Sequence, residues 1–183
     1  GMQRLAEGLG AGVLPAVTYL VVESMYVGDA GASALAAALG RGALPRLQKL
    51  ALTNAAITDA ALVTLAPALR RLPKLESLIL WGNPFGDEGL AALVAPPPPA
   101  GAPPPAGAPP PPPSTGGLAK LRLLDLRQTQ ITDAGCATLA AALDSGTLLA
   151  LTDLVMYAIP ASVAAKAALR EAAKSRAVGI ALI

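Results

Sequence analysis

Residues 75–89 read LESLILWGNPFGDEG, and this stretch decides the fold. It begins with leucines that alternate with other residues. Asn83, Phe85, Asp87 and Gly89 follow at every second position. Related stretches recur along the chain with starts at Val17, Leu47, Leu75, Leu121 and Leu151, so the intervals between successive starts are 30, 28, 46 and 30. An internal period of this kind indicates a protein built from stacked repeats.

The longest of these intervals contains a proline-rich insert. Residues 96–113 include twelve prolines, and removing this segment restores an interval of 28. We expect the segment to be extended or disordered and dispensable for folding, because proline can neither pair in a sheet nor continue a helix. One interpretation is a tolerated insertion between a helix and the next strand. The other is a ligand for a polyproline-binding domain, with Pro109–Pro113 as a profilin-type run.

Each unit begins with apolar residues of period 2 and continues with apolar residues three and four apart, as at Leu62, Leu65 and Leu69. The first pattern predicts a short strand and the second a helix. The predicted strands centre near 20–22, 50–52, 78–80, 124–126 and 154–156, and the predicted helices span 30–40, 60–71, 87–95, 134–144 and 161–176. A further start is expected at Ala177, with Ile180 and Leu182 at the matching offsets.

An acidic residue recurs just before each of the first four complete helices, at Asp29, Asp59, Asp87 and Asp133. Aspartate at a helix start accepts backbone N–H bonds and meets the positive end of the helix dipole. We therefore predict that each of these residues caps its own helix. A ladder of metal ligands is disfavoured because the chain has no histidine and successive carboxylates are a whole unit apart.

Strand, loop and helix repeated at these intervals resemble the leucine-rich repeat family, and the Asp-x-Gly after the loop resembles its ribonuclease-inhibitor-like class. The full pattern occurs at Leu75 to Gly89, whereas Met25, Ala55 and Thr129 replace its asparagine in other units. The resemblance implies a single α/β domain over residues 1–183 with about five repeats and partial units at both ends. It also implies a right-handed horseshoe with a parallel sheet on the concave face and helices on the convex face.

Composition argues against several classes of function. Without histidine, His-dependent catalytic triads and His–metal sites are excluded, and no glycine-rich phosphate-binding motif occurs. The net charge of +2 is too small to indicate nucleic acid. No apolar run approaches the roughly 18 residues that a membrane span needs. We therefore expect no enzymatic activity, no cofactor, and neither nucleic acid nor membrane as a partner.

The single cysteine, Cys136, takes a helix position that Leu62 and Leu90 hold in other units, so we expect it to be a buried apolar side chain. One cysteine cannot form an internal disulfide, and the chain lacks the cysteine-rich end caps common in extracellular leucine-rich repeats. Both features favour a reducing, cytoplasmic location, with the nucleus or a cilium as the other intracellular sites.

Side chains between the leucines of each strand are expected on the concave face. The chain has one tryptophan, three tyrosines and one phenylalanine, and only Phe85 falls at a core position. Tryptophan, tyrosine and arginine dominate the hot spots of protein interfaces. The candidate partner-binding residues are Tyr19, Glu23, Tyr26, Lys49, Thr53, Ile79, Trp81, Asp125, Arg127, Asp153 and Tyr157. The alternative is lateral stacking that merely covers the sheet.

The remaining charged residues are assigned to solvated faces. Lys166, Arg170 and Lys174 recur at every fourth position of the last helix. A second group lies around the ends of the second unit, at Arg41, Arg46, Lys49, Arg70, Arg71 and Lys74. Asp125 and Arg127 are separated by a single residue and share one strand face, so we expect them to pair with each other or with neighbours rather than act on a substrate.

The sequence thus predicts a scaffold that binds a protein partner in its concave face. Alternatives are a GTPase-activating regulator similar to the Ran GTPase-activating proteins, and a structural segment of a larger assembly. Leu5 and Leu9 match Leu35 and Leu39, so the chain is expected to open within an earlier helix. The repeat ends at Val17–Val22 and Ile180–Ile183 are then exposed, which predicts self-association.

Overall fold

The computed structural model describes residue 14, residues 16–95 and residues 118–182. Within these ranges the chain forms one six-stranded sheet in which neighbouring strands follow the order of the sequence. Its strands are β1 (Tyr19–Glu23), β2 (Lys49–Thr53), β3 (Ser77–Ile79), β4 (Leu123–Asp125), β5 (Asp153–Val155) and β6 (Gly179–Ala181). Its helices are α2 (Gly28–Gly40), α3 (Asp59–Arg70), α4 (Asp87–Val94), α5 (Asp133–Asp144) and α6 (Val163–Ser175).

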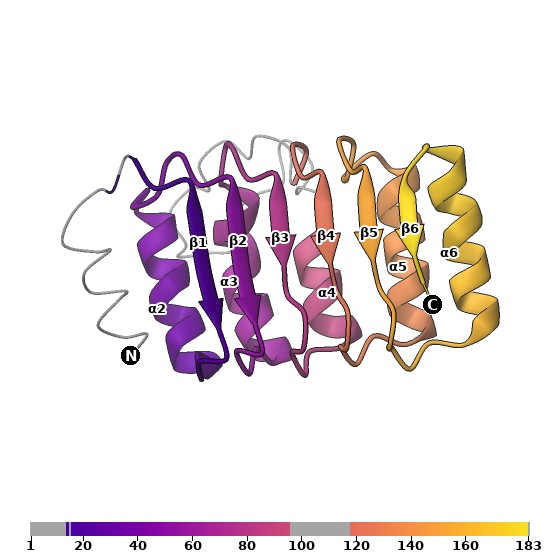
Figure 1. The fold of residues 1–183 in the computed structure, drawn as a ribbon, viewed down its shortest axis with the longest axis horizontal. Coiled ribbons are helices and arrows are strands. Elements are labelled where there is room, and N and C mark those ends of the chain that lie inside the picture. The colour runs from indigo at the N-terminus through magenta and orange to yellow at the C-terminus, as the bar shows by residue number, and fades with distance from the viewer. Residues whose placement is uncertain (1–13, 15, 96–117, 183) are drawn as a thin grey trace, which may run out of the picture.

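Strands and helices alternate to form a right-handed α/β solenoid, which confirms the predicted fold class (Figure 1). All neighbouring strands are parallel, and the helices cover one face of the sheet. The predicted strands and helices agree closely with the observed ones, and the expected start at Ala177 leads into β6. The opposite face of the sheet, which we call the open face, carries none of the helices formed by residues 16–95 and 118–182.

The strand register confirms the repeat period and the position of the insert. Leu50 pairs with Leu20 on one side and with Leu78 on the other, so the pairing follows the intervals between the repeat starts. Leu78 pairs in the same way with Leu124, although the insert lies between them in the sequence. The insert therefore enters between α4 and β4, and the prediction of its own conformation lies outside the described residues, as does that for Leu5 and Leu9.

Deleting residues 96–113 should leave the fold intact. The deletion gives β3 and β4 the same offset in sequence as β2 and β3, so the two strands can keep their pairing. Shortening the connection should stabilise the protein by at most about 1 kcal/mol through a smaller loop-closure entropy. Thermal unfolding followed by circular dichroism should give one cooperative transition for both proteins. A deletion variant that unfolds without cooperativity would show that the prolines contribute to packing.

The leucines of the pattern form a continuous core between the sheet and the helices. Strand residues such as Leu50, Leu78 and Leu124 are fully buried against helix residues such as Leu62 and Leu139. Phe85 and Cys136 are also buried, as predicted. Burial raises the pKa of the Cys136 thiol, followed by the charge of Asp133 as a smaller cause, so this side chain is not a reactive thiolate.

The prediction that each aspartate caps its own helix is wrong. The hydroxyls of Thr58, Thr132 and Ser162 cap α3, α5 and α6 by accepting backbone N–H bonds. The aspartates instead reach the next unit. Asp59 Oδ1 accepts from the N–H groups of Gly86 and Gly89 at 2.9 and 2.7 Å. Asp87 and Asp133 accept from both the N–H and the hydroxyl of Thr132 and Ser162, and Asp29 accepts from the Thr58 hydroxyl.

This sideways contact occurs because each aspartate lies within the first turn of its helix, beside the start of the next helix. It also explains the glycine of the Asp-x-Gly pattern. A Cβ atom on Gly89 would lie 2.9 Å from Asp59 Oδ1, and one on Gly135 would lie closer still to Asp87 Oδ1. The bonds donated by Ser162, from its backbone first and its hydroxyl second, hold the pKa of Asp133 below its usual value. The carboxylates thus link successive units.

Both ends of the solenoid carry repeat residues that were expected to be exposed. At the first end, Val17 and Leu20 are half-buried and Val22 is buried, so the expectation of an exposed apolar end is wrong for these residues, whereas Tyr19, Val21, Met25 and Tyr26 are exposed on β1 and in the loop after it. At the other end Ile180 is half-buried and Leu182 is buried, so the expectation of an exposed apolar end there is wrong for these residues. Helix α6 contacts β6 and covers part of it. Self-association through the ends stays a prediction.

Across residues 16–95 and 118–182, no helix combines the length and apolar character of a membrane span. The same residues contain no group of three or more acidic or cysteine side chains arranged to hold a metal ion.

Candidate functional site

The candidate residues occupy the open face, but they differ in exposure. Tyr19, Glu23 and Asp153 are exposed on the sheet, and Tyr26 is exposed in the loop after β1. Lys49, Ile79, Trp81, Arg127 and Tyr157 are half-buried. Thr53 and Asp125 are only 5% and 4% exposed, so the expectation that their side chains are exposed is wrong, and their contact with a partner stays a prediction. The guanidinium of Arg127, two residues further along the same segment, lies over the Asp125 carboxylate.

Trp81, Arg127 and Tyr157 form a row just beyond the ends of β3, β4 and β5. Backbone bonds continue the sheet to this point, because Asn54 N–H donates to the Trp81 carbonyl at 3.0 Å and Gly82 N–H donates to the Arg127 carbonyl at 2.9 Å. Gln128 N–H donates in turn to the Tyr157 carbonyl. Asn54, Gly82 and Gln128 all have positive φ angles, so the chain turns sharply at these points.

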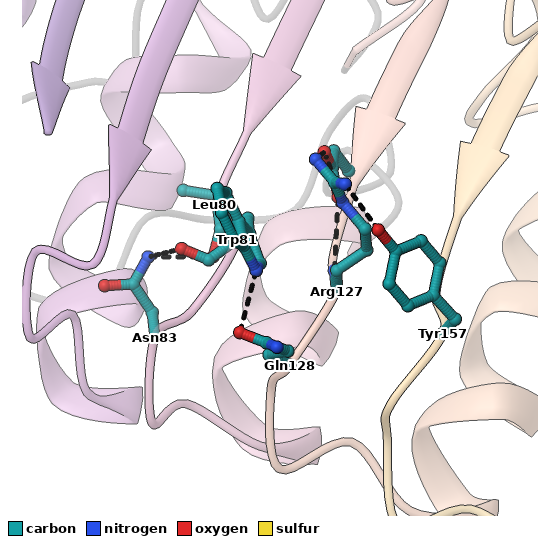
Figure 2. Close-up of polar contacts among 7 residues, drawn as sticks. Leu80, Trp81, Asn83, Arg127, Gln128 and Tyr157 are labelled. Carbon is teal, nitrogen blue, oxygen red and sulfur yellow. Dashed lines mark hydrogen bonds and ion pairs between the residues drawn. The ribbon is translucent and has the colours of Figure 1, made fainter.

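Asn83 holds the turn that carries Trp81. Its side chain is 1% exposed, and its Oδ1 accepts from the N–H groups of Ala55 and Ile57 at 3.0 Å each. Its Nδ2 donates to the Leu52 carbonyl at 2.6 Å. The same Nδ2 donates to the Leu80 carbonyl at 2.8 Å (Figure 2). One amide therefore satisfies backbone groups of two successive units.

Arg127 lies at the centre of the site and confirms the predicted pairing with Asp125. Its Nε donates to both carboxylate oxygens of Asp125 at 2.8 and 2.9 Å, and Nη2 donates to Oδ2. Nη1 donates to the Tyr157 hydroxyl at 2.6 Å (Figure 2). The guanidinium carbon lies 4.8 Å from the centroid of the Trp81 ring and 5.2 Å from that of Tyr157. The guanidinium is thus held between two aromatic rings and above a buried carboxylate.

Gln128 belongs to this group of side chains, although the sequence pattern did not single it out. Its Oε1 accepts from Trp81 Nε1 at 2.9 Å and so fixes the orientation of the indole (Figure 2). Gln128 follows the strand pattern and has no periodic signal of its own. Its positive φ angle of 51° turns the chain at this point, which no sequence pattern indicated.

The electrostatics of the cluster favour a fixed but neutral surface. The hydrogen bond with Asp125, and after it that with Tyr157, raises the pKa of Arg127 above its usual range, so the guanidinium stays charged. Asp125 compensates this charge directly beneath the surface. An arginine has five N–H groups, and these two partners leave part of that donor capacity for an acceptor on another molecule. The cluster combines aromatic area with hydrogen-bond donors.

Comparisons with known proteins bear on the repeats and on the fold. Residues 71–94 and 117–140 match the family model described as Leucine Rich repeat. No curated protein sequence matches the chain. Among solved structures, the fold is similar to a chain described as Leiomodin-1 Actin-Binding Site 2, with a TM-score of 0.56 and 16% identity. That alignment covers 96% of this chain and 87% of the other. The ribonuclease-inhibitor-like class stays a prediction.

Proposed function

We propose that this solenoid of leucine-rich repeats binds a protein partner through its open face and catalyses no reaction. The observation that carries the proposal is the cluster of Trp81, Arg127 and Tyr157, together with Asp125 and Gln128, on that face. We call these five residues the aromatic cluster. Tryptophan, tyrosine and arginine are the side chains that contribute most to protein interfaces.

The rigidity of the aromatic cluster supports a binding role. Each long side chain is held by a hydrogen bond or a ring contact before any partner arrives. Ordering a flexible side chain at an interface costs about 0.5–1.5 kcal/mol, and a pre-ordered side chain avoids most of that cost. The lateral stacking considered as an alternative is present, but it leaves Trp81, Arg127 and Tyr157 only half-buried. Stacking and binding are therefore compatible.

Two further observations support a protein as the ligand. Leucine-rich repeats generally mediate contacts between proteins, and the similar leiomodin-1 chain is described as an actin-binding site. This likeness concerns the fold, and we do not propose actin as the partner of this chain. Tyr19, Val21 and Tyr26 add exposed apolar area at the β1 end of the open face, where a partner could continue.

Substituting Trp81 with alanine should weaken partner binding by at least about 2 kcal/mol, or about 30-fold in Kd. The substitution removes the largest ring of the aromatic cluster and releases Gln128 and Arg127. Proteins captured from a lysate by the wild-type chain would be identified, purified and titrated individually against both chains. Because Trp81 is the one tryptophan in the sequence, its fluorescence should also change when a partner covers the open face.

Lys174→Ala is the matched control, because Lys174 lies on α6 and pairs only with the exposed Glu171. This control should bind each captured protein as the wild type does. Circular dichroism should confirm that both variants are folded, since Trp81→Ala also loses one ring contact and one hydrogen bond. Partners that bind Trp81→Ala normally and leave the tryptophan emission unchanged would place the binding surface elsewhere.

The other features expected from the sequence remain proposals of the same kind. An intracellular, cytoplasmic location is supported by the single buried Cys136. Binding of a polyproline-reading domain at Pro109–Pro113 is supported by composition alone. The GTPase-activating alternative gains no support from the geometry of the open face.

A further inference from the structure

A row of cations lies along the edge of the sheet where the strands begin. Three short turns lead into β2, β3 and β4, with the sequences LPRL at 44–47, LPKL at 72–75 and LAKL at 118–121. The third residue of each turn is basic and exposed, at Arg46, Lys74 and Lys120. The leucine that follows each cation is buried. In the first and third turns, the N–H of that leucine also donates to the carbonyl of the first leucine. The apolar residues thus anchor the turns while the cations face solvent.

The three cations are in register across neighbouring units. Shortly after each of them, backbone bonds connect the strands, because Glu76 N–H donates to Gln48 and Arg122 N–H donates to Glu76 at 2.8 and 2.7 Å. Adjacent strands lie about 4.8 Å apart, so the cations follow one another in steps of about 5 Å. The insert separates Lys120 from Lys74 in the sequence, and the pairing of β3 with β4 keeps both cations in the row.

Two more exposed cations, Arg41 and Arg71, lie at the C-terminal ends of α2 and α3, on the same edge (the upper edge in Figure 1). We call Arg41, Arg46, Arg71, Lys74 and Lys120 the basic edge. Within residues 16–95 and 118–182, the ion pairs are Asp125–Arg127 and Glu171–Lys174, so no described acid neutralises the basic edge by direct contact. Glu76 is exposed on this edge, next to Arg122 of the following unit.

The fold explains only part of this arrangement. Cations at the ends of helices interact favourably with the helix dipole, which accounts for Arg41 and Arg71. Arg46, Lys74 and Lys120 precede strands and have no such role. The acidic residues that link the units, Asp29, Asp59, Asp87 and Asp133, all lie at the opposite edge, where the helices begin. Positive charge is therefore concentrated along one side of the first three units.

We infer that the basic edge is a second interaction surface and that it binds an acidic helix of a protein partner. Carboxylates at positions i, i+3 and i+7 of a helix are separated along the helix axis by about 4.5 Å and then by about 6 Å. These separations match cations spaced at about 5 Å. A single-stranded nucleic acid would need aromatic side chains for base stacking. The aromatic residues of the chain lie on the open face, in the core and in the loop after β1 instead. This surface is separate from the aromatic cluster.

The test uses a fluorescein-labelled alanine-rich helical peptide with glutamate at i, i+3 and i+7, and a glutamine version of the same peptide. Fluorescence anisotropy should show that the full chain binds the glutamate peptide, more weakly as salt rises, and does not bind the glutamine peptide. The combined variant Arg46→Ala, Lys74→Ala, Lys120→Ala should lose at least tenfold in affinity. Trp81→Ala should bind as the wild type does, which separates this result from the proposal for the open face.

The matched control is Lys166→Ala, Arg170→Ala, Lys174→Ala, which removes the same charge from α6. It should retain the affinity of the wild type, with circular dichroism confirming that both triple variants are folded. Equal losses in the two triple variants would overturn the inference, because overall charge would then explain binding. No binding of the glutamate peptide, or stronger binding of an oligonucleotide or of anionic phosphatidylserine vesicles through the same three cations, would overturn it as well.

Discussion

Replacing Arg127 with alanine is expected to lower the free energy of unfolding by about 2–3 kcal/mol. Removing one partner of a buried ion pair costs about 3–5 kcal/mol, because the other charge is left uncompensated. Arg127 is partly exposed to solvent, so we expect a loss of stability below that range. The Asp125 carboxylate is 6% exposed and bonds to the Arg127 guanidinium through Nε and Nη2. The variant also loses the ring contacts with Trp81 and Tyr157. Urea unfolding, followed by Trp81 fluorescence, measures this change.

A second substitution at Asp125 tests the cause. If the uncompensated carboxylate is responsible, the double variant Asp125→Ala, Arg127→Ala should be more stable than Arg127→Ala alone, with a coupling free energy of about 1–3 kcal/mol between the two positions. Lys174→Ala, which breaks an exposed ion pair, should cost at most about 1 kcal/mol. An Arg127→Ala variant as stable as wild type would mean that the aromatic cluster contributes nothing to folding.

Asn83→Ala is expected to be at least as damaging, at about 3 kcal/mol or more. Each buried polar group left without a partner costs about 1–3 kcal/mol, and Asn83 satisfies two N–H groups and two carbonyls. The loss should be cooperative, because these groups belong to the loops of two adjacent units. Hydrogen exchange of the Ala55 and Ile57 amides should accelerate in the variant, since both donate to Asn83.

The repeat itself provides the control for Asn83. Thr129 holds the equivalent position in the following unit and is equally buried, but its hydroxyl makes a single bond, to the Leu126 carbonyl at 2.8 Å. Thr129→Ala should therefore cost about 1 kcal/mol, the usual net value of one hydrogen bond. Similar losses for the two substitutions would contradict the assignment of Asn83 as the residue that joins two loops.

The fold could be predicted because its cause is a local pattern that repeats. Leucines of period 2, such as Leu78 and Leu80, must share one face of a strand, and leucines three and four apart, such as Leu62 and Leu65, must share one face of a helix. Once the units have the same length, stacking them is the arrangement that buries all these faces together. The strand register across the insert was predicted from the repeat interval of 28 that remains when the insert is removed, and Leu78 does pair with Leu124.

The candidate site was predictable only in outline. Strand alternation assigned Tyr19, Trp81 and Tyr157 to the open face, but it could not show that Thr53 and Asp125 are covered by neighbours. Asp125 is covered by Arg127 of the same segment, and only the folded geometry shows that the guanidinium lies over the carboxylate. Gln128 escaped notice for a similar reason, since its contact with Trp81 depends on a backbone turn.

The sequence by itself determined the repeating unit, the sheet and helix layers, the core leucines and the site of the insert, because each follows from periods within one unit. Tertiary structure alone decided what happens between units. It directed Asp59 to the start of the next helix and enclosed Arg127 between Trp81 and Tyr157. Such contacts depend on distances of a few ångströms between side chains from different units, and these distances exist only after the units have stacked.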